Sequence, residues 1–166
     1  MMERPNAWLT YSDADMQDLE TVAKKYRHFL NVGKTERECI TQIVKEAEEA
    51  GYVSLEEKVK NGEDLKAGDK VYQVGMQKII ALYHIGEEDL AQGMNILCAH
   101  IDSPRLDIKQ NPLYEDTDLA YLDTHYYGGV KKYQWVALPM AMHGVIVKKD
   151  GTVVNVTVGE DEDDPV

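Results

Sequence analysis

The chain has 166 residues, so one domain is the default and parts of two are possible. Its hydrophobic content of 43% is enough for a packed core, and no apolar run is long enough to predict a membrane helix. The net charge of −12 argues against nucleic acid or an anionic membrane as a partner. Cys39 and Cys98 lie far apart in apolar contexts and predict no disulfide framework. Since no apolar signal region opens the chain, we expect a soluble, cytoplasmic protein.

The first third of the chain predicts helices, over residues 12–31, 35–50 and 54–60. Ser12 with Asp15 resembles a capping box, and Thr35 with Glu38 matches one fully. Gly51 is well placed to end the second helix in a left-handed conformation.

From Lys70 onward the pattern favours strands. They are expected over residues 70–74, 78–85, 94–99 and 105–109, within 119–126, and over 138–148 and 152–158. The first two predict an antiparallel pair. Lys149-Asp150-Gly151 predicts a hairpin turn between the last two. Helices followed by strands indicate an α/β fold.

One short motif stands out at the end of the apolar segment Met94–Ala99, which predicts a buried strand. His100 follows that segment, and Asp102 lies two residues further on. At strand spacing the two side chains face the same way. His100 could then bind a metal through one ring nitrogen while Asp102 holds the ring in place. A bare His-x-Asp triplet also arises by chance, so a structural histidine remains the alternative.

The other candidate groups favour structural roles. No His-x-x-x-His, Cys-x-x-Cys or His-Glu-x-x-His motif occurs. We expect His28 at a helix surface, His84 packed in a strand, and His143 in a strand too. For His125 a functional role and a structural role are equally open. Three adjacent glutamate pairs and the acidic run at 160–164 are typical of solvated surface.

Three longer segments resemble the M18 family of zinc aminopeptidases. Residues 98–109 are similar to that family's Ala-His-Thr-Asp-Ser-Pro motif and the alternating strand after it. Residues 124–129 resemble its Thr-Tyr-Gly-Gly region, and 144–148 its Gly-x-Val-x-Val-Lys strand. Residues 110–114 and 131–135 point to a bacterial, aspartyl-aminopeptidase-like branch rather than to the animal aspartyl aminopeptidases. Ile101 replaces the usual Thr, which is harmless if its side chain faces away from the site.

The resemblance implies that the chain contains parts of two domains. Residues 1–110 would be the N-terminal part of the catalytic α/β domain, and residues 111–166 the incomplete start of an inserted, strand-rich dimerisation domain. His100 would bind one of two zinc ions, with cobalt possible in their place, and Asp102 would be the catalytic residue that orients it. The remaining ligands and the general base lie later in the family's longer chains, and the substrate-binding residues stay unknown.

The implied function is a zinc-dependent aminopeptidase that removes N-terminal residues from peptides and forms a homo-oligomer when complete. This chain would be an N-terminal fragment that is inactive alone, because it lacks most metal ligands. The alternative is a non-catalytic binding or assembly module that keeps the family's shape. The coding sequence beyond codon 166 separates the two, since a truncated enzyme requires a downstream Glu-Glu pair and a final histidine.

Overall fold

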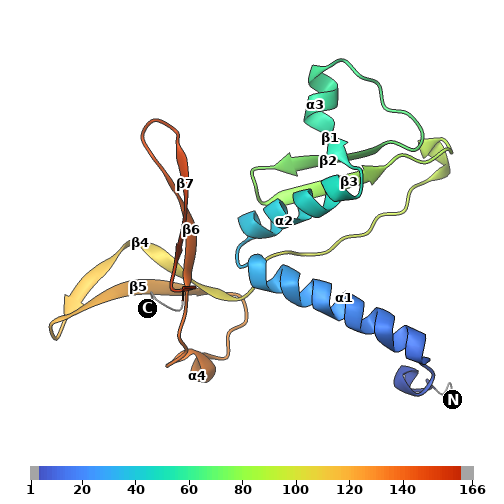
Figure 1. Ribbon diagram of the computed structural model, residues 1–166. Helices are drawn as coiled ribbons and strands as arrows, with labels where there is room; N and C mark the ends of the chain where they lie inside the picture. Colours follow the sequence, from blue (N-terminus) through green and yellow to red (C-terminus); the bar gives the residue numbers. More distant parts are fainter. Residues whose placement is uncertain (1–3, 162–166) are drawn as a thin grey trace. The chain divides into compact units, whose positions relative to one another are not determined.

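The computed structural model describes residues 4–161, which form two compact units that meet in sequence between Asn95 and Ile96, each described here by itself (Figure 1). This division in space does not test the predicted domain division at residue 110, which stays a prediction. Among residues 4–161, no helix is both long and apolar enough to cross a membrane.

The first unit combines helices with a small sheet. Its helices are α1 (Asp13–Val32), α2 (Glu36–Glu49) and α3 (Leu55–Lys60), with short 3-10 helices at Ala7–Leu9 and Leu90–Gln92. Its strands are β1 (Val53–Ser54), β2 (Lys70–Gly75) and β3 (Ile79–His84), in the order β1-β2-β3. The three predicted helices and the antiparallel β2–β3 pair are thereby confirmed, whereas β1 and the two 3-10 helices were not predicted.

The ends of the helices follow the predicted local signals. The Ser12 hydroxyl accepts from the backbone N–H of Asp15, and the Asp15 carboxylate accepts from that of Ser12. Thr35 and Glu38 form the same reciprocal pair at the start of α2. Gly51 takes the left-handed backbone (φ +86°) just past α2, as expected. Each capping box satisfies N–H groups that a helix start leaves without partners.

The core of the first unit lies between α2 and the sheet. Cys39, Ile40 and Ala47 on α2 are buried together with Val71 on β2. Figure 1 shows α2 lying across β2 and β3. A polar contact joins the same two layers, because the Tyr72 hydroxyl donates to Oε1 of Glu48 at 2.7 Å.

The second unit is built from two hairpins. They are β4 (Arg105–Asp116) with β5 (Leu119–Tyr127), and β6 (Met142–Val147) with β7 (Val153–Val158), and α4 (Lys132–Trp135) lies between them in sequence. The second hairpin was predicted from Lys149-Asp150-Gly151. Gly151 there donates to the Lys148 carbonyl with φ +85°. Strand β4 is longer than expected, and the short helix α4 was not predicted.

Segment 94–99, predicted as a buried strand, is neither a strand nor buried. Its side chains are exposed, with Leu97 at 99% of its full accessible surface. Apolar composition favours a strand only where a neighbouring strand pairs with its backbone, and no described residue does so here. Residues 138–141, predicted to begin the first strand of the last hairpin, likewise lie outside β6.

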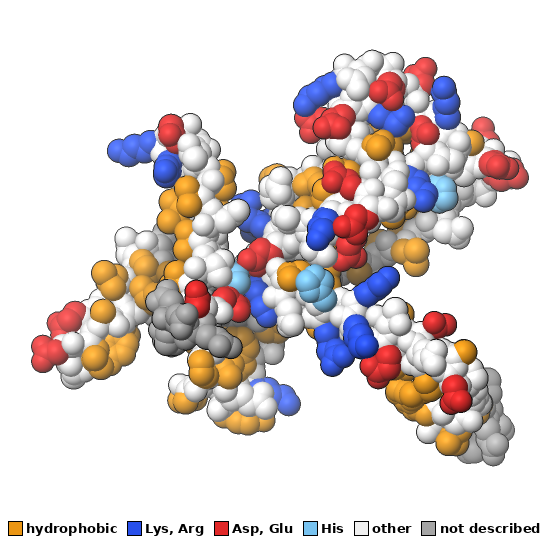
Figure 2. All heavy atoms as spheres, viewed as in Figure 1, with side chains coloured by type: hydrophobic (Ala, Val, Ile, Leu, Met, Phe, Trp, Pro, Cys, Tyr) orange, Lys and Arg blue, Asp and Glu red, His pale blue; other side chains and the backbone are white. Residues whose placement is uncertain are grey.

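The hairpins of the second unit also expose apolar side chains. Ile146, Val147 and Val153 on β6 and β7 are each more than half exposed. Figure 2 shows hydrophobic atoms along this hairpin. A two-stranded hairpin has no second layer to cover its apolar face, which is why these residues meet solvent.

Replacing Thr35 with Ala should lower the free energy of unfolding by about 1 kcal/mol, because it removes the side-chain acceptor at the start of α2. Chemical denaturation followed by circular dichroism measures this. Thr41→Ala is the matched control, since the exposed Thr41 hydroxyl bonds only to the Arg37 carbonyl within the helix and alanine suits a helix interior. Equal stabilities of the two variants would contradict a capping role for Thr35.

The Tyr72 hydroxyl should resist ionisation. The hydrogen bond to Glu48, helped by partial burial and the nearby negative charge, raises the pKa of Tyr72 to about 12. Because the folded pKa is raised, this stabilisation is fully present below the ordinary tyrosine pKa of about 10 and is lost as the pH rises through 12. Titration of carbon-13-labelled tyrosine by NMR should show Glu48→Gln lowering that pKa, while Glu49→Gln leaves it in place. A Tyr72 that titrates with the other tyrosines in the unaltered chain would refute the bond.

Candidate functional site

His100 lies just before β4, in a stretch without helix or strand. Its Nδ1 is 3.0 Å from Oδ1 of Asp102 and 3.0 Å from the Asp102 backbone carbonyl. Carboxylate and carbonyl oxygens are both acceptors, so Nδ1 must carry the hydrogen. In a neutral ring the lone pair is then on Nε2, the nitrogen a metal would use. The His100 side chain is 85% exposed, so Nε2 is accessible.

Asp102 is held from both sides. Oδ1 accepts from His100, and Oδ2 accepts from the Tyr127 hydroxyl at 2.7 Å. The Tyr127 hydrogen bond is the main cause that lowers the pKa of the Asp102 carboxyl, with the His100 contact adding less and partial burial opposing both. At neutral pH the group is therefore a carboxylate, which can accept from both neighbours and donate to neither.

The β4–β5 hairpin positions Tyr127. Tyr127 ends β5 and is the register partner of Arg105, which begins β4. The Arg105 guanidinium carbon lies 4.1 Å from the centre of the Tyr127 ring, and Arg105 Nε donates to Oδ1 of Asp107 at 2.7 Å. A cation stacked on an aromatic face stabilises both side chains. The ring that carries the hydroxyl is thus supported by a strand pair.

Gly128 lets the chain leave β5 beside the site. Its φ is +74°, and a Cβ there would lie 3.4 Å from Cα of Pro104. A side chain at this position would meet a conformational penalty of about 1 kcal/mol. The glycine thus allows the backbone after Tyr127 to run close to the segment that carries Asp102.

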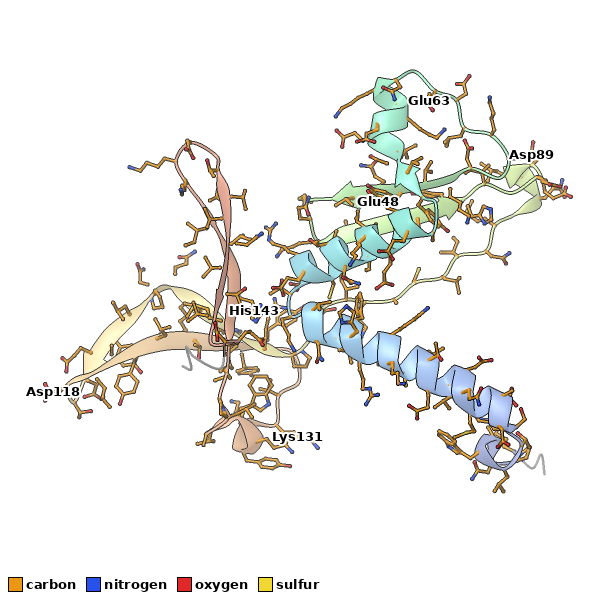
Figure 3. The ribbon with its side chains drawn as sticks, viewed as in Figure 1. Glu48, Glu63, Asp89, Asp118, Lys131 and His143 are labelled. Atoms are coloured by element: carbon orange, nitrogen blue, oxygen red, sulfur yellow. The ribbon has the colours of Figure 1, made fainter. Side chains whose placement is uncertain are left out.

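The other histidines lie elsewhere. His143 on β6, labelled in Figure 3, pairs through Nε2 with Oε1 of Glu160 at 3.0 Å. His125 is exposed and stacks on the Tyr126 ring. His28 is exposed on α1, as expected. His84 was expected to pack, but its side chain is exposed on β3, because only one layer covers this small sheet.

Within the described part of the chain, no three His, Cys, Asp or Glu side chains gather closely enough to hold a metal ion. Both cysteines are free, and burial raises the pKa of the Cys39 thiol, which disfavours the thiolate that binds metals. His100 fits the role of one zinc ligand, because it is an imidazole whose second nitrogen is hydrogen-bonded to a carboxylate. A catalytic zinc needs two or more further protein ligands.

Tyr127 is the site residue that sequence reasoning missed. The segment that contains it was singled out only by its resemblance to a family motif. It lies 25 residues from Asp102, and no local pattern links the two. Strands were expected over residues 105–109 and within 119–126, but their pairing, which returns the end of β5 to the start of β4, was not predicted.

Comparisons with known proteins place these residues in a family. Residues 29–166 match the family model described as aminopeptidase I zinc metalloprotease (M18). The chain is 57% identical over its full length to the protein named "Probable M18 family aminopeptidase 1" of Clostridium acetobutylicum, of which it covers 36%.

Solved structures agree with this match. The crystal structure of aminopeptidase I from Borrelia burgdorferi B31 superposes with a TM-score of 0.89 at 35% identity, over 97% of this chain and 39% of that one. The M18 aminopeptidase of Thermotoga maritima gives a TM-score of 0.87 at 40% identity, over 99% and 35% of the two chains. These matches confirm the predicted α/β fold.

The chain spans about a third of the length of the relatives it matches, in agreement with the prediction of an N-terminal portion. Family and fold thus accord with the motif at residues 98–109, and the chain belongs to the M18 family of aminopeptidase I zinc metalloproteases.

Proposed function

We propose that the whole protein is a zinc-dependent aminopeptidase and that this chain supplies one corner of its active site. The observation that carries the proposal is the hydrogen bonding of His100. Nδ1 faces two acceptors at 3.0 Å, and Nε2 is left for a metal. Membership in a zinc metalloprotease family supports zinc as that metal.

In this proposal His100 is a metal ligand and Asp102 is the residue that keeps its ring oriented. When bound, zinc would polarise the peptide carbonyl and activate water for its hydrolysis. We propose two zinc ions per complete site, which cobalt could replace, with peptides as substrates. The Asp102 carboxylate fixes the Nδ1–H tautomer, which leaves the lone pair on Nε2. Through its negative charge it also makes the imidazole a stronger electron-pair donor to the metal.

We also propose that residues 1–110 belong to the catalytic domain and that residues 111–166 begin an inserted, strand-rich dimerisation domain. Support comes from the secondary structure, because from Arg105 onward the described chain consists of two hairpins, the first of which spans residues 110 and 111, and one four-residue helix. Homo-oligomerisation of the whole protein follows from this proposal. A cytoplasmic location is supported by two cysteines that are both free.

Replacing His100 with Ala in the whole protein should lower the zinc content, measured by elemental analysis, and abolish the release of N-terminal residues. Asp102→Asn should weaken zinc affinity or activity by about ten- to a hundredfold, because an amide holds the ring less well. His28→Ala, which alters an exposed histidine on α1, is the control. Full zinc content and activity in both site variants would refute the assignment.

The purified 166-residue chain should release no N-terminal residue from peptides, with or without added zinc. Its described residues offer one histidine ligand, whereas a catalytic zinc usually needs three protein ligands. Mass spectrometry of a peptide mixture after prolonged incubation measures this. Metal-dependent cleavage that co-purifies with the chain and disappears in His100→Ala would overturn the prediction.

A further inference from the structure

We propose that Tyr127 is a positioning residue for the metal site, which acts through Asp102 to keep the His100 ring in its metal-binding tautomer. This inference rests on the proposed role of His100 as a ligand. It adds to that role a third residue, which lies in the β4–β5 hairpin.

The first argument is that Asp102 needs a second anchor. Its carboxylate is 39% exposed, and it belongs to a stretch with no helix or strand to hold it. A single hydrogen bond to His100 would leave the carboxylate free to rotate toward water. The Tyr127 hydroxyl takes up the other oxygen at 2.7 Å, which leaves Oδ1 directed at the His100 ring.

The second argument is that Tyr127 is itself well held. It is in strand register with Arg105, whose guanidinium stacks 4.1 Å from its ring centre. That guanidinium is tied in turn to Asp107 by an ion pair at 2.7 Å. Because a strand pair fixes the position of Tyr127, its hydroxyl can restrain the Asp102 carboxylate, which lies outside any strand.

The third argument concerns the chemistry of the contact. A phenol hydroxyl at neutral pH is a donor to a carboxylate, so it preserves the negative charge that attracts the Nδ1 hydrogen. Loss of the hydroxyl would let the carboxylate turn and would leave Nδ1 with the Asp102 backbone carbonyl as its remaining acceptor, which weakens its hold on the hydrogen. The ring could then place its hydrogen on Nε2, where it blocks metal binding.

Tyr127→Phe tests the proposal, because it removes the hydroxyl and keeps the ring beneath Arg105. Tyr126→Phe is the matched control, a neighbouring tyrosine with the same atom removed and no hydrogen bond to the site. In the whole protein, zinc affinity measured by chelator competition should fall about three- to tenfold in Tyr127→Phe, less than in Asp102→Asn. It should be unchanged in Tyr126→Phe.

A double-mutant cycle separates positioning from general support of the fold. If Tyr127 acts through Asp102, adding Tyr127→Phe to Asp102→Asn should cause little further loss of zinc affinity. A loss that adds in full to that of Asp102→Asn would overturn the proposal. Wild-type zinc affinity in Tyr127→Phe would also overturn it.

A spectroscopic readout follows the tautomer without metal. In the 166-residue chain, nitrogen-15 NMR of the neutral His100 ring should show a smaller Nδ1–H fraction in Tyr127→Phe and no change in Tyr126→Phe. An unchanged fraction in Tyr127→Phe would contradict the proposal. The two proposals fail differently. If His100→Ala keeps its zinc, the ligand assignment is wrong, whereas if only Tyr127→Phe behaves as wild type, the positioning role alone is wrong.

Discussion

The Asp102 carboxylate accepts a hydrogen bond at each of its two oxygens, one from His100 and one from Tyr127. Everything distinctive about the site depends on this shared group. It sets which His100 nitrogen carries the hydrogen, and it connects a segment without secondary structure to the end of a strand. Because a charged acceptor strengthens both bonds, neither neighbour could be replaced by an apolar residue without loosening the other.

The β4–β5 hairpin provides the support for that interaction. Its register places Arg105 opposite Tyr127, so the first residue of one strand stacks on the last residue of the other. The hairpin closes at Thr117 and Asp118, which both adopt positive φ as a two-residue turn requires. The turn lies far along the strands from the site, and the register shifts between Ile108 and Leu113. The pairing of Arg105 with Tyr127 therefore belongs to the part of the ladder on the site's side of that shift.

Segment 94–99 shows the limit of composition as a guide to structure. Its apolar residues match those of a buried strand, yet Leu97 is almost fully exposed. A strand exists only if its backbone groups find partners, and composition does not supply them. The meeting of His100 with Asp102 was expected from strand spacing, yet it occurs in an irregular segment, because two residues so close in sequence can meet there as well.

The features that depend on neighbours along the chain could be predicted from the amino-acid sequence alone. These include the capping boxes at Ser12 and Thr35, the turn at Gly151 and the pairing of His100 with Asp102, since each involves residues at most three positions apart. Two features became visible only in the folded chain: the hydrogen bond from Tyr127 to Asp102, and the exposure of segment 94–99. Both depend on which distant backbone segment lies beside the residues concerned. Strand pairing and packing set this, and short-range sequence patterns do not encode them.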